Sequence, residues 1–152
     1  MNKLKYEQVL HRLAAYCSRS ERCVWDIRRK MNIWEIPSDQ QNRIIQHLRK
    51  EKFVDEERYC KAFVHDKAKY NRWGIHKIRF ELRKRQIPES LIQEALKNLN
   101  PEETRERLRI LLEQKKKSVK GKNEWEIRQK LLRFAASRGF SQEDFEKAVS
   151  EE

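Results

Sequence analysis

One basic stretch combines an aromatic ring with a cluster of cations: NRWGIHKIRFELRKRQIP, residues 71–88. On a helix, Ile75, Ile78 and Leu82 would share one face and be buried together. Phe80 would then lie on the charged side, three or four residues along the chain from His76, Lys77, Arg83 and Lys84. An aromatic ring among cations can stack on a nucleic-acid base or enter a pocket of a protein partner. The pattern therefore favours binding over catalysis.

A structural interpretation of the same stretch stays open. Charged helix faces are usually just solvated, and Phe80 would then pack against a neighbouring part of the chain. The equivalent positions in the other two copies of this segment, described below, are Arg29 and Gln129. Phe80 is therefore not a core residue that every copy needs, and both interpretations remain.

The other reactive side chains form no catalytic or metal-binding pattern. The acids Asp55, Glu56 and Glu57 fall where the first turn of a helix is expected, a usual place for acids. The four histidines are scattered, and the three cysteines, Cys17, Cys23 and Cys60, match neither a disulfide framework nor a zinc site. We therefore expect no enzymatic activity, no metal and no cofactor. The cysteines should be small buried residues in a reducing cytoplasm.

The chain is basic along its whole length. It has 36 Lys and Arg against 24 Asp and Glu in 152 residues, a formal net charge of +12. Such a surface attracts polyanions, so we expect weak binding to single- and double-stranded DNA without sequence preference. No apolar run is long enough for a signal peptide or a membrane span, so no membrane partner is expected.

The elements that carry these residues repeat along the chain. The segment DIRRKMNIWEIPS from Asp26 corresponds to KIRFELRKRQIPE from Lys77, at an offset of 51 residues. A third copy, EIRQKLLRFAASRGFS, begins at Glu126 and places Ile127-Arg128 at an offset of 49 from the second. A period near 50 with helical apolar spacing predicts tandem helical repeats that cover one another's apolar faces. We expect three repeats, at residues 1–50, 51–100 and 101–152.

Helix signals predict an all-α chain of about nine helices, three in each repeat. Three glycines and three prolines are too few for many hairpin turns. The expected ranges are residues 4–18, 21–32, 38–50, 55–71, 74–86, 88–99, 101–118, 124–138 and 141–151. Ser20 is expected to cap the second helix, and Ser38 with Gln41 resembles a capping box at the third. Because each repeat shares its core only with its neighbours, the chain should be elongated and monomeric.

Two further groups of cations each have two interpretations. Arg28, Arg79 and Arg128 occupy the same helix position three times, beside the apolar stripe. Each could bond an acid or a helix end in the next repeat, or together they could form a ladder that meets repeated charges on a filament. KKKSVKGK, residues 115–122, is either a solvated joint or a source of unspecific phosphate contacts. Trp25 and Trp125 are equivalent, and most of the four tryptophans are expected to pack within the repeats.

The chain resembles the RecX proteins, regulators of the bacterial recombinase RecA. The resemblance is carried by FVDEERYCKAFVHDKAKYNRWGIHKIRFELRKRQIP, residues 53–88, and by LLRFAASRGFS, residues 131–141. It extends in the same order over about residues 8–150. It implies a curved rod of three-helix repeats that binds in the groove of a RecA–DNA filament. Whether inhibition would occur by capping or by wedging stays open. It also implies inhibition of recombination and of RecA's coprotease activity, and so a part in DNA repair and the SOS response.

The expected contacts with the filament and with DNA are fourteen basic residues and one aromatic: Arg28, Arg29, Lys30, Arg72, Lys77, Arg79, Phe80, Arg83, Lys84, Arg85, Lys115, Lys116, Lys117, Arg128 and Arg133. The alternative is a stand-alone nucleic-acid-binding or transcription-regulating protein built from the same helical units. Its reading helices would need polar or basic N-terminal ends. The third helices instead begin with acids such as Asp39 and Glu89, which would repel phosphates.

Overall fold

Nine α-helices account for the fold in the computed structural model, which describes residues 5–150. They are α1 (Tyr6–Arg19), α2 (Val24–Ile33), α3 (Ser38–Lys50), α4 (Glu56–Lys69), α5 (Ile75–Lys84), α6 (Glu89–Leu96), α7 (Pro101–Lys116), α8 (Glu124–Ser137) and α9 (Gln142–Ser150). No strand occurs within that part of the chain. The all-α prediction, with nine helices, is therefore confirmed.

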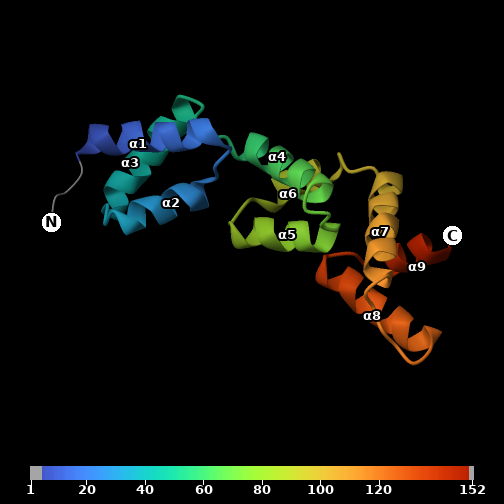
Figure 1. Cartoon of the computed structure of the whole chain (residues 1–152). Helices are drawn as coiled ribbons and strands as arrows, with labels where there is room; N and C mark the ends of the chain where they lie inside the picture. The colour runs from blue at the N-terminus through green and yellow to red at the C-terminus, as the bar shows by residue number, and fades with distance from the viewer. Residues whose placement is uncertain (1–4, 151–152) are drawn as a thin grey trace.

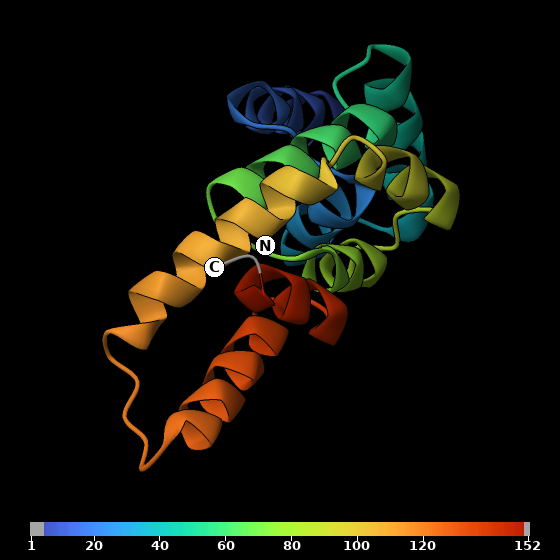
Figure 2. The same ribbon diagram turned by 90° about the vertical axis from the view of Figure 1, so that its right-hand side faces the viewer.

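The helices form three groups of three that follow one another along a bent, elongated molecule (Figure 1). Each group has its own apolar cluster. The clusters are centred on Leu13 and Ile27 in the first group, on Ile78 and Leu82 in the second, and on Leu108 and Phe145 in the third. Seen from the C-terminal side, the end of α7 and the start of α8, with the segment that joins them, project from the rest of the molecule (Figure 2). The repeat boundaries at residues 50 and 100 stay a prediction.

One predicted helix start and two predicted caps are wrong. Ser20 lies in extended backbone after α1, and α2 begins at Val24 with Cys23 before it. The Cys23 amide donates to the Asp26 carboxylate at 3.1 Å, so an acid of the first turn caps the helix instead of a serine. Ser38 is the first residue of α3 and caps nothing. Gln41 is buried and donates to the Ile36 carbonyl at 2.8 Å, which ties α3 to the preceding turn.

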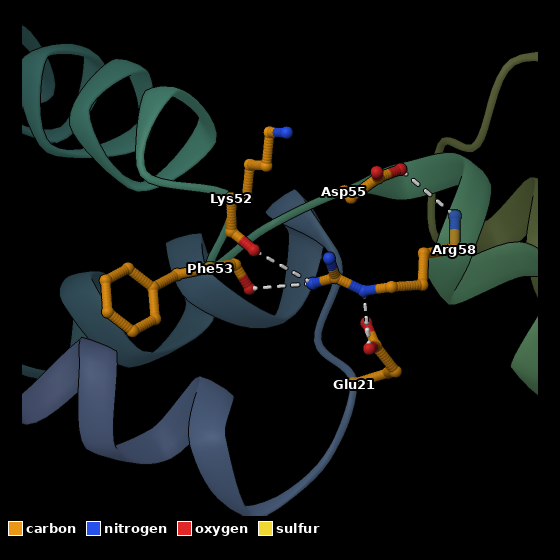
Figure 3. A network of polar contacts seen from close by, with 5 residues as sticks. All are labelled: Glu21, Lys52, Phe53, Asp55 and Arg58. Atoms are coloured by element: carbon orange, nitrogen blue, oxygen red, sulfur yellow. Dashed lines mark hydrogen bonds and ion pairs between the residues drawn. The ribbon is translucent and has the colours of Figure 1, made fainter.

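The joint between the first and second repeats is held by Arg58 of α4 (Figure 3). Its Nε donates to the Glu21 carboxylate at 2.6 Å, on the segment between α1 and α2. Its Nη2 donates to the backbone carbonyls of Lys52 and Phe53, between α3 and α4. Asp55 accepts the Arg58 amide and thereby fixes the start of α4. One guanidinium thus connects three segments across the joint.

The joint between the second and third repeats uses backbone contacts. The Gly74 amide donates to the Arg138 carbonyl at 2.7 Å, and the His76 amide donates to the Gly139 carbonyl at 3.0 Å. The start of α5 therefore meets the end of α8, so unpaired helix-end groups of opposite partial charge satisfy one another. Arg72 adds a side-chain bond to Gln114 of α7 at 2.9 Å.

Candidate partner-binding surface

Phe80 lies on the outer face of α5 and is 66% exposed. Ile78 and Leu82 are fully buried, and Ile75 packs against the core of the second repeat. The inward face of α5 is therefore complete without Phe80. The structural interpretation, in which Phe80 packs against a neighbouring repeat, is wrong. A largely exposed phenyl ring is instead available to a partner.

The cations around Phe80 differ in whether they already have a partner within the chain. Arg83 holds the Glu89 carboxylate with two nitrogens, at 2.9 and 3.0 Å, and this pairing lowers the pKa of Glu89. Lys77 lies over the Trp73 ring at 4.7 Å, toward the third repeat. Lys84 is exposed and forms no ion pair with any residue between 5 and 150. Phe80 and Lys84 together are named the α5 face here.

The three equivalent arginines all bond within their own repeat. Arg79 lies 4.0 Å from Glu89 of α6, and Arg128 forms an ion pair with Glu146 of α9. Arg28 donates instead to two neutral amides of α3, Gln41 at 3.3 Å and Asn42 at 2.9 Å. The expected bond into the next repeat is therefore wrong. Each arginine ties the second helix of a repeat to the third.

Three predicted contact residues from two different repeats come together at the first joint. Arg28 and Arg29 of α2 and Arg85 at the end of α5 line one cavity of about 410 Å³. Trp25, Arg49 and Glu56 also line it. We call this cavity the basic pocket. The sequence-based site lacked Trp25, which was assigned to packing, and Arg49, because the end of α3 and α2 are separated in the sequence and meet only in the fold.

The remaining predicted contacts are dispersed. Lys30 lies over the Tyr16 ring at 5.0 Å, away from the basic pocket. In the lysine-rich segment, α7 continues through Lys116, and Lys115 lies over the Phe134 ring at 5.1 Å. Lys116, Lys117 and Arg133 are exposed. Trp25 packs across the joint against the core of the second repeat, whereas its equivalent Trp125 is 70% exposed. The fifteen predicted residues thus form several separate surfaces.

The three cysteines are buried or partly buried, and their thiols are poorly reactive. Burial raises the pKa of Cys17 and Cys60 to about 11 and that of Cys23 to about 12, which suppresses the nucleophilic thiolate. Across residues 5–150 there is no group of three or more His, Cys, Asp or Glu that could hold a metal ion. No helix in that range is both long and apolar enough to cross a membrane.

Comparison with protein families identifies two of the repeats. Residues 55–96 match the second three-helix domain of RecX, and residues 102–149 match the third. A regulatory protein RecX from Clostridium botulinum (strain Eklund 17B / Type B) is 29% identical over 127 residues. That match covers 82% of this chain and 59% of the relative, so the chain spans well under two thirds of that protein's length. A regulatory protein RecX from Haemophilus ducreyi is 30% identical over 130 residues, covering 84% of this chain and 82% of the relative.

Solved structures show the same fold. A crystal structure of a regulatory protein RecX superposes with a TM-score of 0.88 at 25% identity, covering 95% of this chain and 73% of that one. The crystal structure of RecX from Lactobacillus salivarius superposes with a TM-score of 0.82 at 18% identity, over 96% and 95% of the two chains. The second likeness concerns the fold alone.

Proposed function

The chain belongs to the RecX family of regulatory proteins, and from that membership we propose that it binds a RecA–DNA filament and inhibits it. The inhibited activities are recombination and the coprotease activity of RecA. Weak DNA binding without sequence preference accompanies filament binding, as expected from a net charge of +12. The protein acts in the cytoplasm, as a monomer and without catalysing a reaction.

Beside the family membership, the exposed Phe80 on α5 is the structural observation that supports this proposal. The fold already buries Ile78 and Leu82, so the ring contributes little to the core. A large exposed aromatic beside a free lysine is a typical anchor for a protein or nucleic-acid partner. α5 belongs to the middle of the three groups of helices (Figure 1), so an anchor there would have a repeat on each side of it.

The alternative of a stand-alone DNA reader is less well supported. In the structure the third helices carry acids in their first turns: Asp39 in α3, Glu89 in α6, and Glu143 and Asp144 in α9. A helix that enters the major groove presents its N-terminal residues to bases and phosphates. Carboxylates at those places would repel the phosphates, so a major-groove mode is disfavoured.

Filament assembly tests the proposal. RecA is assembled on single-stranded DNA with ATP, and its ATPase and strand-exchange rates are measured with increasing amounts of this protein. We expect both rates to fall at micromolar protein or below. Unchanged rates at saturating protein would refute filament inhibition. A light-scattering measurement of molar mass on the free protein tests the monomer, and a mass twice that of the chain would contradict it.

A further inference from the structure

The basic pocket contains more positive charge than its surroundings neutralise. Four guanidiniums line it, from Arg28, Arg29, Arg49 and Arg85, against one carboxylate, Glu56. Arg49 pairs with Glu56 at 3.3 Å, and Arg85 pairs with Glu81 at 2.8 Å. Arg28 and Arg29 form no ion pair within residues 5–150. The positive charges of these two arginines are thus not neutralised by a carboxylate in that part of the chain.

Arg28 differs from its two equivalents in a way that favours an outside anion. Arg79 and Arg128 both face carboxylates of their own repeats, Glu89 and Glu146. The oxygens that Arg28 bonds belong to Gln41 and Asn42, which are neutral. Neutral acceptors orient a guanidinium but do not cancel its charge. Arg28 therefore occupies the same helix position as Arg79 and Arg128, but its positive charge has no carboxylate partner and can attract an anionic ligand.

Trp25 holds two of the remaining three guanidiniums. Arg29 lies over its ring at 4.5 Å from the centroid, and Arg85 at 5.3 Å. In such a cation–π contact the flat face of the guanidinium lies against the ring, so N–H groups at its edge can still donate hydrogen bonds. Because two cations already lie over the ring, we assign Trp25 to positioning the arginines and not to stacking a base.

We propose that the basic pocket binds a backbone phosphate of single-stranded nucleic acid, together with the sugar attached to it. The inference rests on the DNA-binding part of the proposed function and gives it a location. The forked donors of arginine match phosphate oxygens, and a cavity of about 410 Å³ has the size of a small-ligand site. A single strand is flexible enough to place one nucleotide between two repeats, and contact through phosphate carries no sequence preference.

Oligonucleotide binding with matched variants provides the test. The anisotropy of fluorescein-labelled (dT)12 is measured against protein concentration at several salt concentrations between 50 and 200 mM. The pocket variant is Arg28→Gln with Arg29→Gln. The control variant is Arg43→Gln with Lys97→Gln, which loses the same charge at two exposed positions outside the pocket. Thermal melting followed by circular dichroism confirms that each variant is folded.

We expect the pocket variant to bind about tenfold more weakly than the wild type and the control to bind nearly as tightly. Each lost phosphate contact removes about 0.7 from the slope of log K against log salt on a single strand, so the pocket variant, which loses its one bound phosphate, should lose about 0.7. If the two folded variants bind with equal affinity and equal salt slope, the basic pocket is not the phosphate site, although the protein still binds DNA elsewhere. If the wild type itself fails to bind, both the pocket and the DNA-binding part of the proposed function fall. If the pocket variant does not fold, the single variant Arg29→Gln, at an exposed position, replaces it.

The source of the phosphate is tested in the same samples. Inorganic phosphate is added to the complex of wild-type protein with (dT)12 at constant ionic strength. We expect displacement at tens of millimolar phosphate or above, because a free phosphate makes only one of the contacts that the strand makes. Displacement at micromolar phosphate would assign the pocket to free phosphate and overturn the nucleic-acid assignment.

Discussion

Gly74 and Gly139 face each other so closely that neither position has room for a side chain. A Cβ on Gly74 would lie 2.4 Å from the Gly139 carbonyl oxygen, and a Cβ on Gly139 would lie 2.4 Å from the Lys77 Cβ. Gly139 also has φ +94°, where L side chains are strained. This contact, with the two backbone hydrogen bonds beside it, sets how the third repeat meets the second.

We predict that Gly74→Ala weakens this joint. Gly74 has an ordinary φ of −82°, so the added methyl group acts through its clash with backbone atoms of residues 139 and 140. Overpacking of this kind usually costs about 1–3 kcal/mol of unfolding free energy. Urea unfolding followed by circular dichroism measures it. Asn71→Ala, at an exposed neighbouring position, is the control and should shift stability by about 0.5 kcal/mol or less. A Gly74→Ala protein as stable as the control would contradict the prediction.

Arg58→Ala should loosen the joint between the first two repeats. The substitution removes the bond to Glu21 and the bonds to the Lys52 and Phe53 carbonyls, all of which connect different segments (Figure 3). Because these groups are partly exposed, we expect a modest loss of about 1–2 kcal/mol. Small-angle scattering should show a broader distribution of molecular dimensions. The control Lys61→Ala breaks an exposed i,i+4 pair with Glu57 and should change neither measurement. Identical scattering of the two variants would count against Arg58 as the joint's clamp.

The cysteines should react slowly while the protein is folded. Burial raises the pKa of Cys17 and Cys60 from 9.0 to about 11 and that of Cys23 to about 12, so less thiolate is present at pH 8 than in the unfolded chain. A shift of two pKa units lowers the thiolate fraction about a hundredfold. Reaction with a chromogenic disulfide reagent at pH 8, with and without urea, measures this difference. The same raised pKa values mean that stability is lost as pH rises from 9 toward 11. Equal reaction rates in both conditions would refute the prediction.

The helices and their repetition were predictable because they depend on local spacing. The stripe Ile75, Ile78 and Leu82 fixes which side of α5 is buried, and the offset to Ile27 and Ile127 finds the other two copies. Helix starts were less predictable where several polar residues compete. At α2 the capping group is the Asp26 carboxylate inside the first turn, and Ser20, three residues before Cys23, is left in extended backbone. Side-chain competition of this kind depends on where the chain turns, which the apolar period does not specify.

The site was predictable only in part, because charges are neutralised by tertiary contacts. The repeated arginine position was recognised from its spacing, but its partners differ: amides for Arg28, carboxylates for Arg79 and Arg128. No local pattern tells these cases apart. The basic pocket also needs α2 and the end of α5 to meet, although Arg28 and Arg85 are far apart in the sequence. A signal was present in Trp25, whose ring has cations three or more residues away on one helix face, but its second cation comes from another repeat.

The α5 face makes the sharpest prediction, because its two residues can be changed without disturbing the fold. Phe80 is 66% exposed, and Lys84 is exposed without an ion pair in the described part of the chain. Arg83, by contrast, holds Glu89, so reversing its charge would disturb α6 as well as any partner. Phe80→Ala and Lys84→Glu are therefore the cleaner variants. Exposed substitutions usually change stability by about 0.5 kcal/mol or less, so both should melt like the wild type.

We predict that Phe80→Ala weakens filament inhibition about tenfold or more, since an aromatic anchor contributes about 1–2 kcal/mol or more to binding. Lys84→Glu should cause a larger loss of inhibition at low salt than at high salt. Part of the contribution of Lys84 is long-range attraction to the filament, which salt screens. Ile33→Ala is the matched control: Ile33 is also a largely exposed apolar residue, 74% exposed, but it lies on α2 in the first repeat. The measurement is the protein concentration that halves RecA ATPase on single-stranded DNA. If Phe80→Ala and Lys84→Glu inhibit as strongly as Ile33→Ala, the filament does not bind the α5 face, and the basic pocket or the lysine-rich segment 115–122 becomes the surface to test.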